Sequence, residues 1–281
     1  MSRIVRQADS WDEIALKMSD QPYENITVTR EGPAAWIVLS RPEKLNPIDW
    51  ATIKELRRAI AELEASDCLA VIVTGSGRSF SAGGDLEGYI GLYQSKPRFQ
   101  QFLNDFFDML DAIEKSQKIY IAAINGVCVA GGLELLLACD LVIAADTAKI
   151  GDGHLNFGQL PGAGGSQRLP HAIGLLRAKQ LILTGKLLTA AEAERIGLVG
   201  EVVPAAELDE AALRLVTDMA EKSPVGLRGA KHLTNLTLTV PMAAGLKYEM
   251  AYVHRYATEE PDATEGLIAF RDKRKPVFGT R

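Results

Sequence analysis

Apolar and polar positions follow three different patterns near the start of the chain. Residues 26–42, ITVTREGPAAWIVLSRP, contain two short β-branched runs on either side of a Gly-Pro pair, which predicts a β-hairpin. Residues 51–66 repeat apolar side chains every three or four positions, the spacing of a helix that opens at Asp49 or Trp50. Residues 69–77 begin with a continuous apolar run, which is typical of a strand in a sheet covered on both faces.

Strand and helix patterns continue to alternate up to about residue 204. We expect a Gly-rich loop opening a helix over 79–90, a helix over 97–115, a strand, a helix and a strand within 119–145, two short helices over 163–185, and a strand over 197–204. Residues 1–22 show no clear period, and we expect them to form an arm over the body.

From Ala205 onward the pattern is almost wholly helical, with four amphipathic segments bounded by Pro or Ser. The alternation before this point predicts an α/β fold of repeated β-β-α or β-α units. We therefore divide the chain into a core with the active site, residues 1–204, and a helical region, residues 205–281, whose helices cover neighbouring elements or other subunits.

Composition and charge exclude several classes of protein. The net charge of −5 and the absence of a basic cluster argue against binding to nucleic acid. The apolar stretch 119–145 is interrupted by polar residues and glycines, so it predicts buried core and no membrane span. The three cysteines form no CxxC pair and the four histidines are scattered. These features predict reduced thiols in a cytoplasmic protein, and no metal site.

Two glycine-rich turns are the first candidates for chemistry. SAGGD at 81–85 and AGGLE at 130–134 each place adjacent glycines between an extended segment and the start of a helix. The first amides of a helix have no partner within it and carry partial positive charge. Two such turns facing one point would bind a negatively charged oxygen, although either turn alone is also typical of tight packing.

Glu134 is the second candidate, because a carboxylate within GGLELLLACD is costly to bury without a partner. One interpretation is that Glu134 caps its own helix, where negative charge is favoured. The other is that it is a functional carboxylate whose pKa is raised by apolar surroundings. The residues around it leave both open.

Taken together, the ordered motifs of the chain resemble the crotonase family, the enoyl-CoA hydratase/isomerase superfamily. The resemblance covers about residues 24–278 and rests on several ordered segments. These are LSRPEKLNPID at 39–49, GRSFSAGGDL at 77–86, AAINGVCVAGGLELLLACDLVIAA at 122–145, LPGAGGSQRL at 160–169, LTGKLLTAAEAERIGLVGEVVP at 183–204 and DATEGLIAFRDKRKPVF at 262–278.

The resemblance implies a spiral of β-β-α turns followed by a helical trimerisation region. It also implies an enzyme, a lyase or isomerase of fatty acid metabolism, that stabilises acyl-CoA enolates. The backbone amides of Gly84 and Gly131 correspond to the oxyanion hole, and Glu134 to a catalytic carboxylate. The residues that correspond to contacts with CoA or substrate are Lys44, Leu45, Ala82, Asp85, Leu86 and Lys273.

His154 is where the chain departs from that family pattern. Hydratases of the family carry a second carboxylate about twenty residues after the first, and here this position is His154. A histidine still serves as a general acid or base near neutral pH. The alternative is that His154 only bonds a loop carbonyl. Asp152 is the nearest acid, and we expect its side chain to point elsewhere.

The leading functional hypothesis is therefore an enoyl-CoA hydratase/isomerase in which Glu134 and His154 form the catalytic pair. A second is a hydrolase of CoA thioesters or C–C bonds in which His154 activates water, and a third is a non-catalytic relative that binds CoA thioesters or RNA. We expect no cofactor besides the CoA carried by the substrate, no nucleic-acid or membrane partner, and a homotrimer or a hexamer made of two trimers. The sequence does not name the acyl group.

Overall fold

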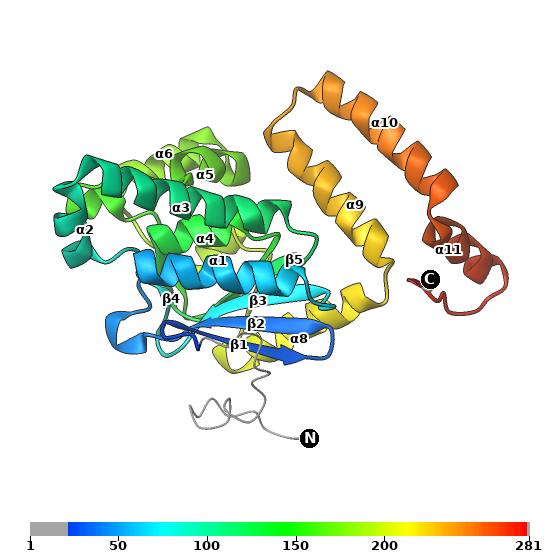
Figure 1. Ribbon diagram of the computed structural model, residues 1–281, viewed down its shortest axis with the longest axis horizontal. Helices are drawn as coiled ribbons and strands as arrows, with labels where there is room; N and C mark the ends of the chain where they lie inside the picture. The colour runs from blue at the N-terminus through cyan, green and yellow to red at the C-terminus, as the bar shows by residue number, and fades with distance from the viewer. Residues whose placement is uncertain (1–21, 280–281) are drawn as a thin grey trace.

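The computed structural model describes residues 22–279 of the 281-residue chain (Figure 1). Nearly all of the expected N-terminal arm, residues 1–22, therefore lies outside the described residues. The predicted hairpin is confirmed: β1 (Ile26–Glu31) and β2 (Ala34–Leu39) pair antiparallel, with Glu31 opposite Ala34 across the Gly-Pro turn.

Within the described residues, the hairpin forms one side of a six-stranded sheet in the order β1-β2-β3-β5-β7-β10. All neighbours after the hairpin pair in parallel. Every residue of β3 and β5 is buried, as expected for strands covered on both faces. The strands that complete this sheet are β3 (Ala70–Gly75), β5 (Ile119–Ile124), β7 (Leu141–Ala145) and β10 (Glu201–Val203).

A second, four-stranded sheet has the order β4-β6-β8-β9. Its strands are β4 (Ser79–Ser81), β6 (Val127–Val129), β8 (Lys149–Gly151) and β9 (Leu188–Thr189). The chain alternates between the sheets, because β3 is followed by β4, β5 by β6 and β7 by β8. Each turn thus adds one strand to each sheet, which is the expected spiral. The sequence pattern missed the strands of this sheet because two or three residues are too few to show a period.

Helices cover the outer faces of the sheets. Asp49 caps α1 (Trp50–Glu64) by accepting a hydrogen bond from the Thr52 amide. Helices α1 and α3 pack against each other, and α3 packs on α4. The helices of the body are α2 (Leu86–Tyr93), α3 (Lys96–Lys115), α4 (Gly131–Ala138), α5 (Gly165–Ile173), α6 (Leu175–Thr184), α7 (Ala190–Arg195) and α8 (Leu208–Ala220).

The core divides into two clusters on opposite faces of the six-stranded sheet. The larger contains inward side chains of α1, α3 and α4, and the smaller joins the other face of the sheet to α8. Along β3, Val71 and Val73 belong to the first cluster and Ile72 to the second. This alternation is the two-residue period of a strand.

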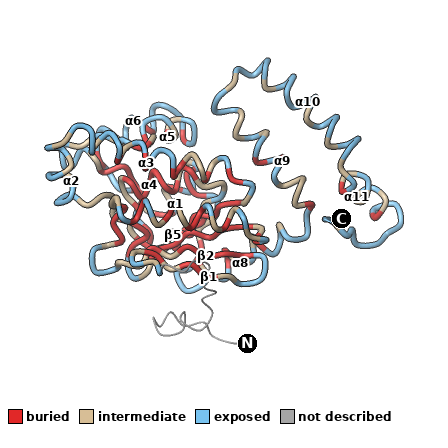
Figure 2. Tube along the Cα trace, viewed as in Figure 1, coloured by how far each residue is buried: buried red, intermediate tan, exposed pale blue. Residues whose placement is uncertain are grey.

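The last three helices form an arm beside the body, to which α9 is joined by hydrogen bonds from Lys231 (Figure 1). They are α9 (Pro224–Asn235), α10 (Met242–Glu259) and α11 (Pro261–Arg271). All three were expected as helices, and so was α8. Buried residues concentrate in the body, whereas the arm is mostly exposed (Figure 2). Helix α10 has no buried residue along its described length.

Candidate active site

The two glycine turns meet in the folded chain. Gly83 has a φ of +97°, and a Cβ placed on it would lie 2.8 Å from the Cβ of Ala130 and 3.4 Å from the nitrogen of Gly131. A side chain at Gly83 is therefore excluded both by the backbone conformation and by the second turn. The proximity of these two turns, which lie almost fifty positions apart in the sequence, is the basis of the site.

Unsatisfied amides lie at this contact. Ala130 has a φ of +51°, unusual for a residue with a Cβ, and the next residue, Gly131, begins α4. Within residues 22–279, neither the Gly84 amide nor the Gly131 amide donates a hydrogen bond to a protein group. Free amides beside a helix start are suited to hold an oxygen that gains negative charge.

Glu134 projects from the first turn of α4 and is almost fully buried, with 1% of its surface exposed. Its Oε1 accepts hydrogen bonds from the amides of Ala163, at 2.7 Å, and Gly165, at 2.9 Å. No side chain caps α4, so the interpretation of Glu134 as a cap of its own helix is wrong. Burial raises the pKa of the Glu134 carboxyl despite these two bonds and the nearby His154.

His154 lies in a short 3-10 helix, His154–Phe157, and points at Glu134. Its Nε2 is 4.0 Å from the Oε2 of Glu134, the oxygen that the two amides leave free. Its Nδ1 is 3.1 Å from the Oδ2 of Asp152. The expectation that Asp152 points elsewhere is wrong. The intervening Gly153 has a φ of +68° and turns the chain back, which an extended strand would not do.

Burial by itself lowers the pKa of the His154 imidazole. The hydrogen bond and charge of Asp152, together with the charge of Glu134, outweigh burial, so the net shift of the pKa is upward. Because its ring bonds a carboxylate, the alternative in which His154 only bonds a loop carbonyl does not describe this site.

Arg168 holds the loop that supplies amides to Glu134. Its guanidinium makes two parallel bonds to Glu114, of 2.7 and 2.8 Å, and a third to the carbonyl of Ala163. A partly buried, two-bonded ion pair of this geometry fixes α5 against α3. Ala163 in turn presents its amide to Glu134.

The residues expected to contact CoA fall into two places. The amide of Ala82 donates to the carbonyl of Leu45, at 2.9 Å, so these two lie together beside the glycine turns. Lys44 is exposed next to Leu45, Asp85 is the N-cap of α2, and Leu86 is 44% exposed. Lys273 is exposed beyond the end of α11, on the arm. One chain therefore does not bring it to the others (Figure 1).

Tyr89, which comes from α2, also lies at the site and was not expected there. A Cβ on Gly84 would lie only 2.1 Å from the hydroxyl oxygen of Tyr89. The ring is held by stacking on Tyr93 and by an edge contact with Phe102. Burial and then the charge of Glu134 raise the pKa of Tyr89, which keeps the phenol protonated. A tyrosine three residues into a helix gives no sequence signal for this placement.

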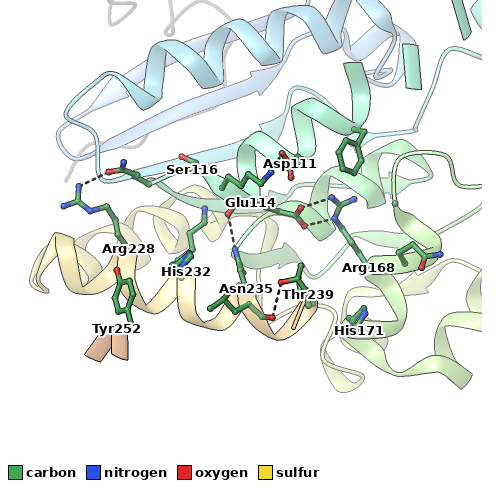
Figure 3. A pocket seen from close by; sticks show the side chains of 18 of the residues that line it. Asp111, Glu114, Ser116, Arg168, His171, Arg228, His232, Asn235, Thr239 and Tyr252 are labelled. Atoms are coloured by element: carbon green, nitrogen blue, oxygen red, sulfur yellow. Dashed lines mark hydrogen bonds and ion pairs between the residues drawn. The ribbon is translucent and has the colours of Figure 1, made fainter. Parts of the chain in front are cut away.

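A separate cavity of about 840 Å³ lies between the body and the arm (Figure 3). Two of the cations that line it already have acidic partners: Arg168 pairs with Glu114, and Lys231 with Asp140. The glycine turns, Glu134 and His154 do not line it. We place the chemistry at the glycine turns because unpaired donors and a buried carboxylate meet there.

The remaining histidines, His171, His232 and His254, are exposed on helices, as expected. No cluster of three or more acidic, cysteine or histidine side chains suited to a metal ion occurs in the described part of the chain. The helices described there include none that is long and apolar enough to cross a membrane.

Comparisons with known proteins identify one family. Residues 29–281 match the family model described as enoyl-CoA hydratase/isomerase. A probable enoyl-CoA hydratase of Mycobacterium tuberculosis is 41% identical, over 92% of this chain and 99% of its own. The short-chain-enoyl-CoA hydratase of Clostridium acetobutylicum is 36% identical, over 89% and 96%.

Solved structures are similar over the same length. The crystal structure of the enoyl-CoA hydratase from Bacillus anthracis has a TM-score of 0.85 and 34% sequence identity, and the match covers 91% of this chain and 99% of that one. In sequence and in structure, the matches cover most of this chain and most of each relative. This chain therefore belongs to the enoyl-CoA hydratase/isomerase family.

Proposed function

We propose that this protein adds water to 2-enoyl-CoA thioesters, with Glu134 and His154 as its catalytic pair. The observation that carries the proposal is the 4.0 Å approach of His154 Nε2 to Glu134 Oε2 inside a buried site. Two opposed proton-transferring groups are what the addition of H and OH across a double bond requires.

The glycine turns supply the other half of the chemistry. A thioester carbonyl placed at the turns would receive hydrogen bonds from the amides of Gly84 and Gly131. These donors stabilise the negative oxygen of the enolate, and each is worth about 3–4 kcal/mol in comparable sites. Neither amide has another partner in the described structure, which supports this assignment.

CoA enters the proposal as the carrier of the acyl group, with no separate cofactor. The pairing of Leu45 with Ala82 supports a path for the CoA chain along this edge, with Lys44 near the solvent. Asp85 and Leu86, at the start of α2, would border the acyl end of that path. The name of the Clostridium acetobutylicum relative supports short enoyl chains as the first substrates to test.

A hydrolase is the second candidate, because an imidazole bonded to a carboxylate also suits the activation of water. Such a base must be neutral to accept a proton. The raised pKa of His154 keeps more of its imidazole charged at neutral pH, so the structure favours the hydratase. Release of free CoA from a β-ketoacyl-CoA, without consumption of crotonyl-CoA, would favour the hydrolase instead.

The direct test is to follow the loss of enoyl absorbance with crotonyl-CoA. We expect turnover by the wild-type protein and a large loss of kcat in His154→Gln. The matched control is His171→Gln, which changes an exposed histidine and is expected to leave kcat unchanged. A wild-type rate no better than that of buffer would refute the hydratase proposal.

We also propose that the protein assembles as a homotrimer, alone or as a pair of trimers. Helix α10 exposes a stripe of Met242, Leu246, Met250 and Val253, which are 49–74% exposed. On α11, Phe270 is 86% exposed. Such a surface is costly in water unless another subunit covers it. Sedimentation of the whole chain as a 30.4 kDa monomer would contradict this part of the proposal.

Assembly would also bear on Lys273, because the arm that carries it extends away from the body (Figure 1). In a trimer, the basic residue of one arm would reach the CoA of a neighbouring subunit. The proposed compartment is the cytoplasm, which is supported by three cysteines without disulfides in the described structure.

A further inference from the structure

Asp152 is a buried residue whose two carboxylate oxygens both contact His154. None of its surface is exposed. Its Oδ1 accepts from the backbone amide of His154, at 3.2 Å, and its Oδ2 meets the ring Nδ1 of the same residue, at 3.1 Å. Its backbone carbonyl accepts from the amide of Ala130, at 2.8 Å, which ties this loop to the turn that begins α4.

This contact fixes which nitrogen of His154 performs the chemistry. An ionised carboxylate accepts hydrogen bonds and donates none, so the Nδ1 facing Asp152 carries a proton. The other nitrogen, Nε2, is left to face Glu134 Oε2 at 4.0 Å. Asp152 therefore fixes the orientation of the imidazole ring through Nδ1, while Nε2 on the other side of the ring faces the catalytic carboxylate of Glu134.

We propose that Asp152 is a positioning residue that makes His154 the proton donor of the reaction and restores its proton after each turnover. This inference rests on the proposed hydratase function and assigns the direction of proton flow within it. The resemblance and the comparisons suggested no role for Asp152.

The oxygen of water bonds to the β carbon, its proton goes to Oε2 of Glu134, and the double-bond electrons move to the thioester oxygen. The enolate electrons then take the proton from Nε2 of His154 onto the α carbon. Glu134 is now protonated and His154 neutral, and a proton passing from Oε2 to the facing Nε2 resets both.

Electrostatics favour this direction. In the described structure the charged groups facing His154 are Asp152, from its own loop, and Glu134, from α4. Both favour the imidazolium. The return of the proton from Glu134 to His154 is favoured for the same reason, since the buried Asp152 carboxylate attracts the charge back to the ring.

The test uses Asp152→Asn, which keeps the shape and removes the charge. Ring NMR of the whole protein gives the pKa of His154, and its signal is identified by its absence in His154→Gln. We expect that pKa to fall in Asp152→Asn, with a loss in kcat of about tenfold or more and little change in KM. The alkaline limb of kcat against pH should move to lower pH. Asp218→Asn, an exposed substitution on α8, is the matched control.

An unchanged His154 pKa and an unmoved alkaline limb in Asp152→Asn would overturn the inference. If that variant does not fold, the wild type decides, because the pKa of His154 should lie above its ordinary 6.5 and its Nδ1 should carry a proton. A pKa at or below 6.5 would overturn the inference. The NMR readings need no turnover, so they stand apart from the crotonyl-CoA assay that tests the hydratase function itself.

Discussion

Glu134→Gln gives the sharpest test of the site, because the structure dictates how the new side chain is oriented. The amides of Ala163 and Gly165 both donate to Oε1, so the carbonyl oxygen of glutamine must take that place. Its NH₂ group then replaces Oε2 and faces Nε2 of His154 at about 4 Å. In the imidazolium form of His154 both of these groups are hydrogen-bond donors. The fold keeps its hydrogen bonds while the base is lost.

The expected magnitude follows from two estimates. A positioned general base contributes about 10²–10⁴ in rate, which corresponds to about 3–5 kcal/mol. The attraction of a carboxylate for an imidazolium at 4 Å is about 4 kcal/mol at an effective dielectric of 20. We therefore expect kcat to fall by about 10²–10⁴ and the pKa of His154 to fall with it. The free energy of unfolding should change by less than about 1 kcal/mol, since the loop bonds remain.

The assay is hydration of crotonyl-CoA, with urea unfolding measured on the same protein. Glu210→Gln, on the exposed face of α8, is the matched control and should behave as wild type. Turnover within twofold of wild type in a folded Glu134→Gln protein would refute the role of Glu134. A large loss of stability would show instead that the carboxylate charge holds the loop.

Three further outcomes are expected. In Gly84→Ala the new Cβ would lie 2.1 Å from the hydroxyl of Tyr89, so the turn must shift and kcat/KM should fall by up to about 100-fold in the crotonyl-CoA assay. Lys231→Met leaves the carboxylate of Asp140 without its 2.8 Å partner, and we expect urea unfolding to show a loss of about 3–5 kcal/mol. In the wild type, the kcat profile should fall as pH rises through the pKa of His154, above its ordinary 6.5, because the proton donor is then lost.

Each of the two substitutions has a control within the chain. Gly91, in the same helix as Tyr89, has open space around a Cβ, so Gly91→Ala should leave kcat/KM unchanged. Lys247 is exposed on α10, and Lys247→Met should leave the urea midpoint in place. Equal effects in test and control variants, or an alkaline limb below pH 6.5, would contradict the corresponding prediction.

Periodicity alone was enough to predict most elements. The hairpin, the helices α1 and α3, the strands β3, β5 and β7, and the helical arm were all expected, because each is long enough to show its pattern. The short strands of the second sheet were not. Val127–Val129 and Lys149–Gly151 owe their conformation to pairing with each other, a contact that local sequence does not encode.

Local chemistry also named the glycine turns and Glu134, since adjacent glycines and a carboxylate among leucines are conspicuous in any sequence. Whether Glu134 caps its own helix or serves the site was decided by Ala163 and Gly165, about thirty positions later. Their amides reach Glu134 only in the folded chain. The contact of Tyr89 with Gly84 is more local, because side chains of a helix lean toward its start.

The sequence by itself determined the α/β alternation and the helical arm, because these depend on periods along the chain. The spiral and the departure at His154 were implied by the resemblance of its motifs to the family. Only the tertiary structure decided which groups act together. Asp152 and His154 are two residues apart, and the left-handed conformation of Gly153 turns the chain so that the Asp152 carboxylate contacts both the ring and the backbone amide of His154. The electrostatics of a site depend on distance through space, and that distance is set by the fold.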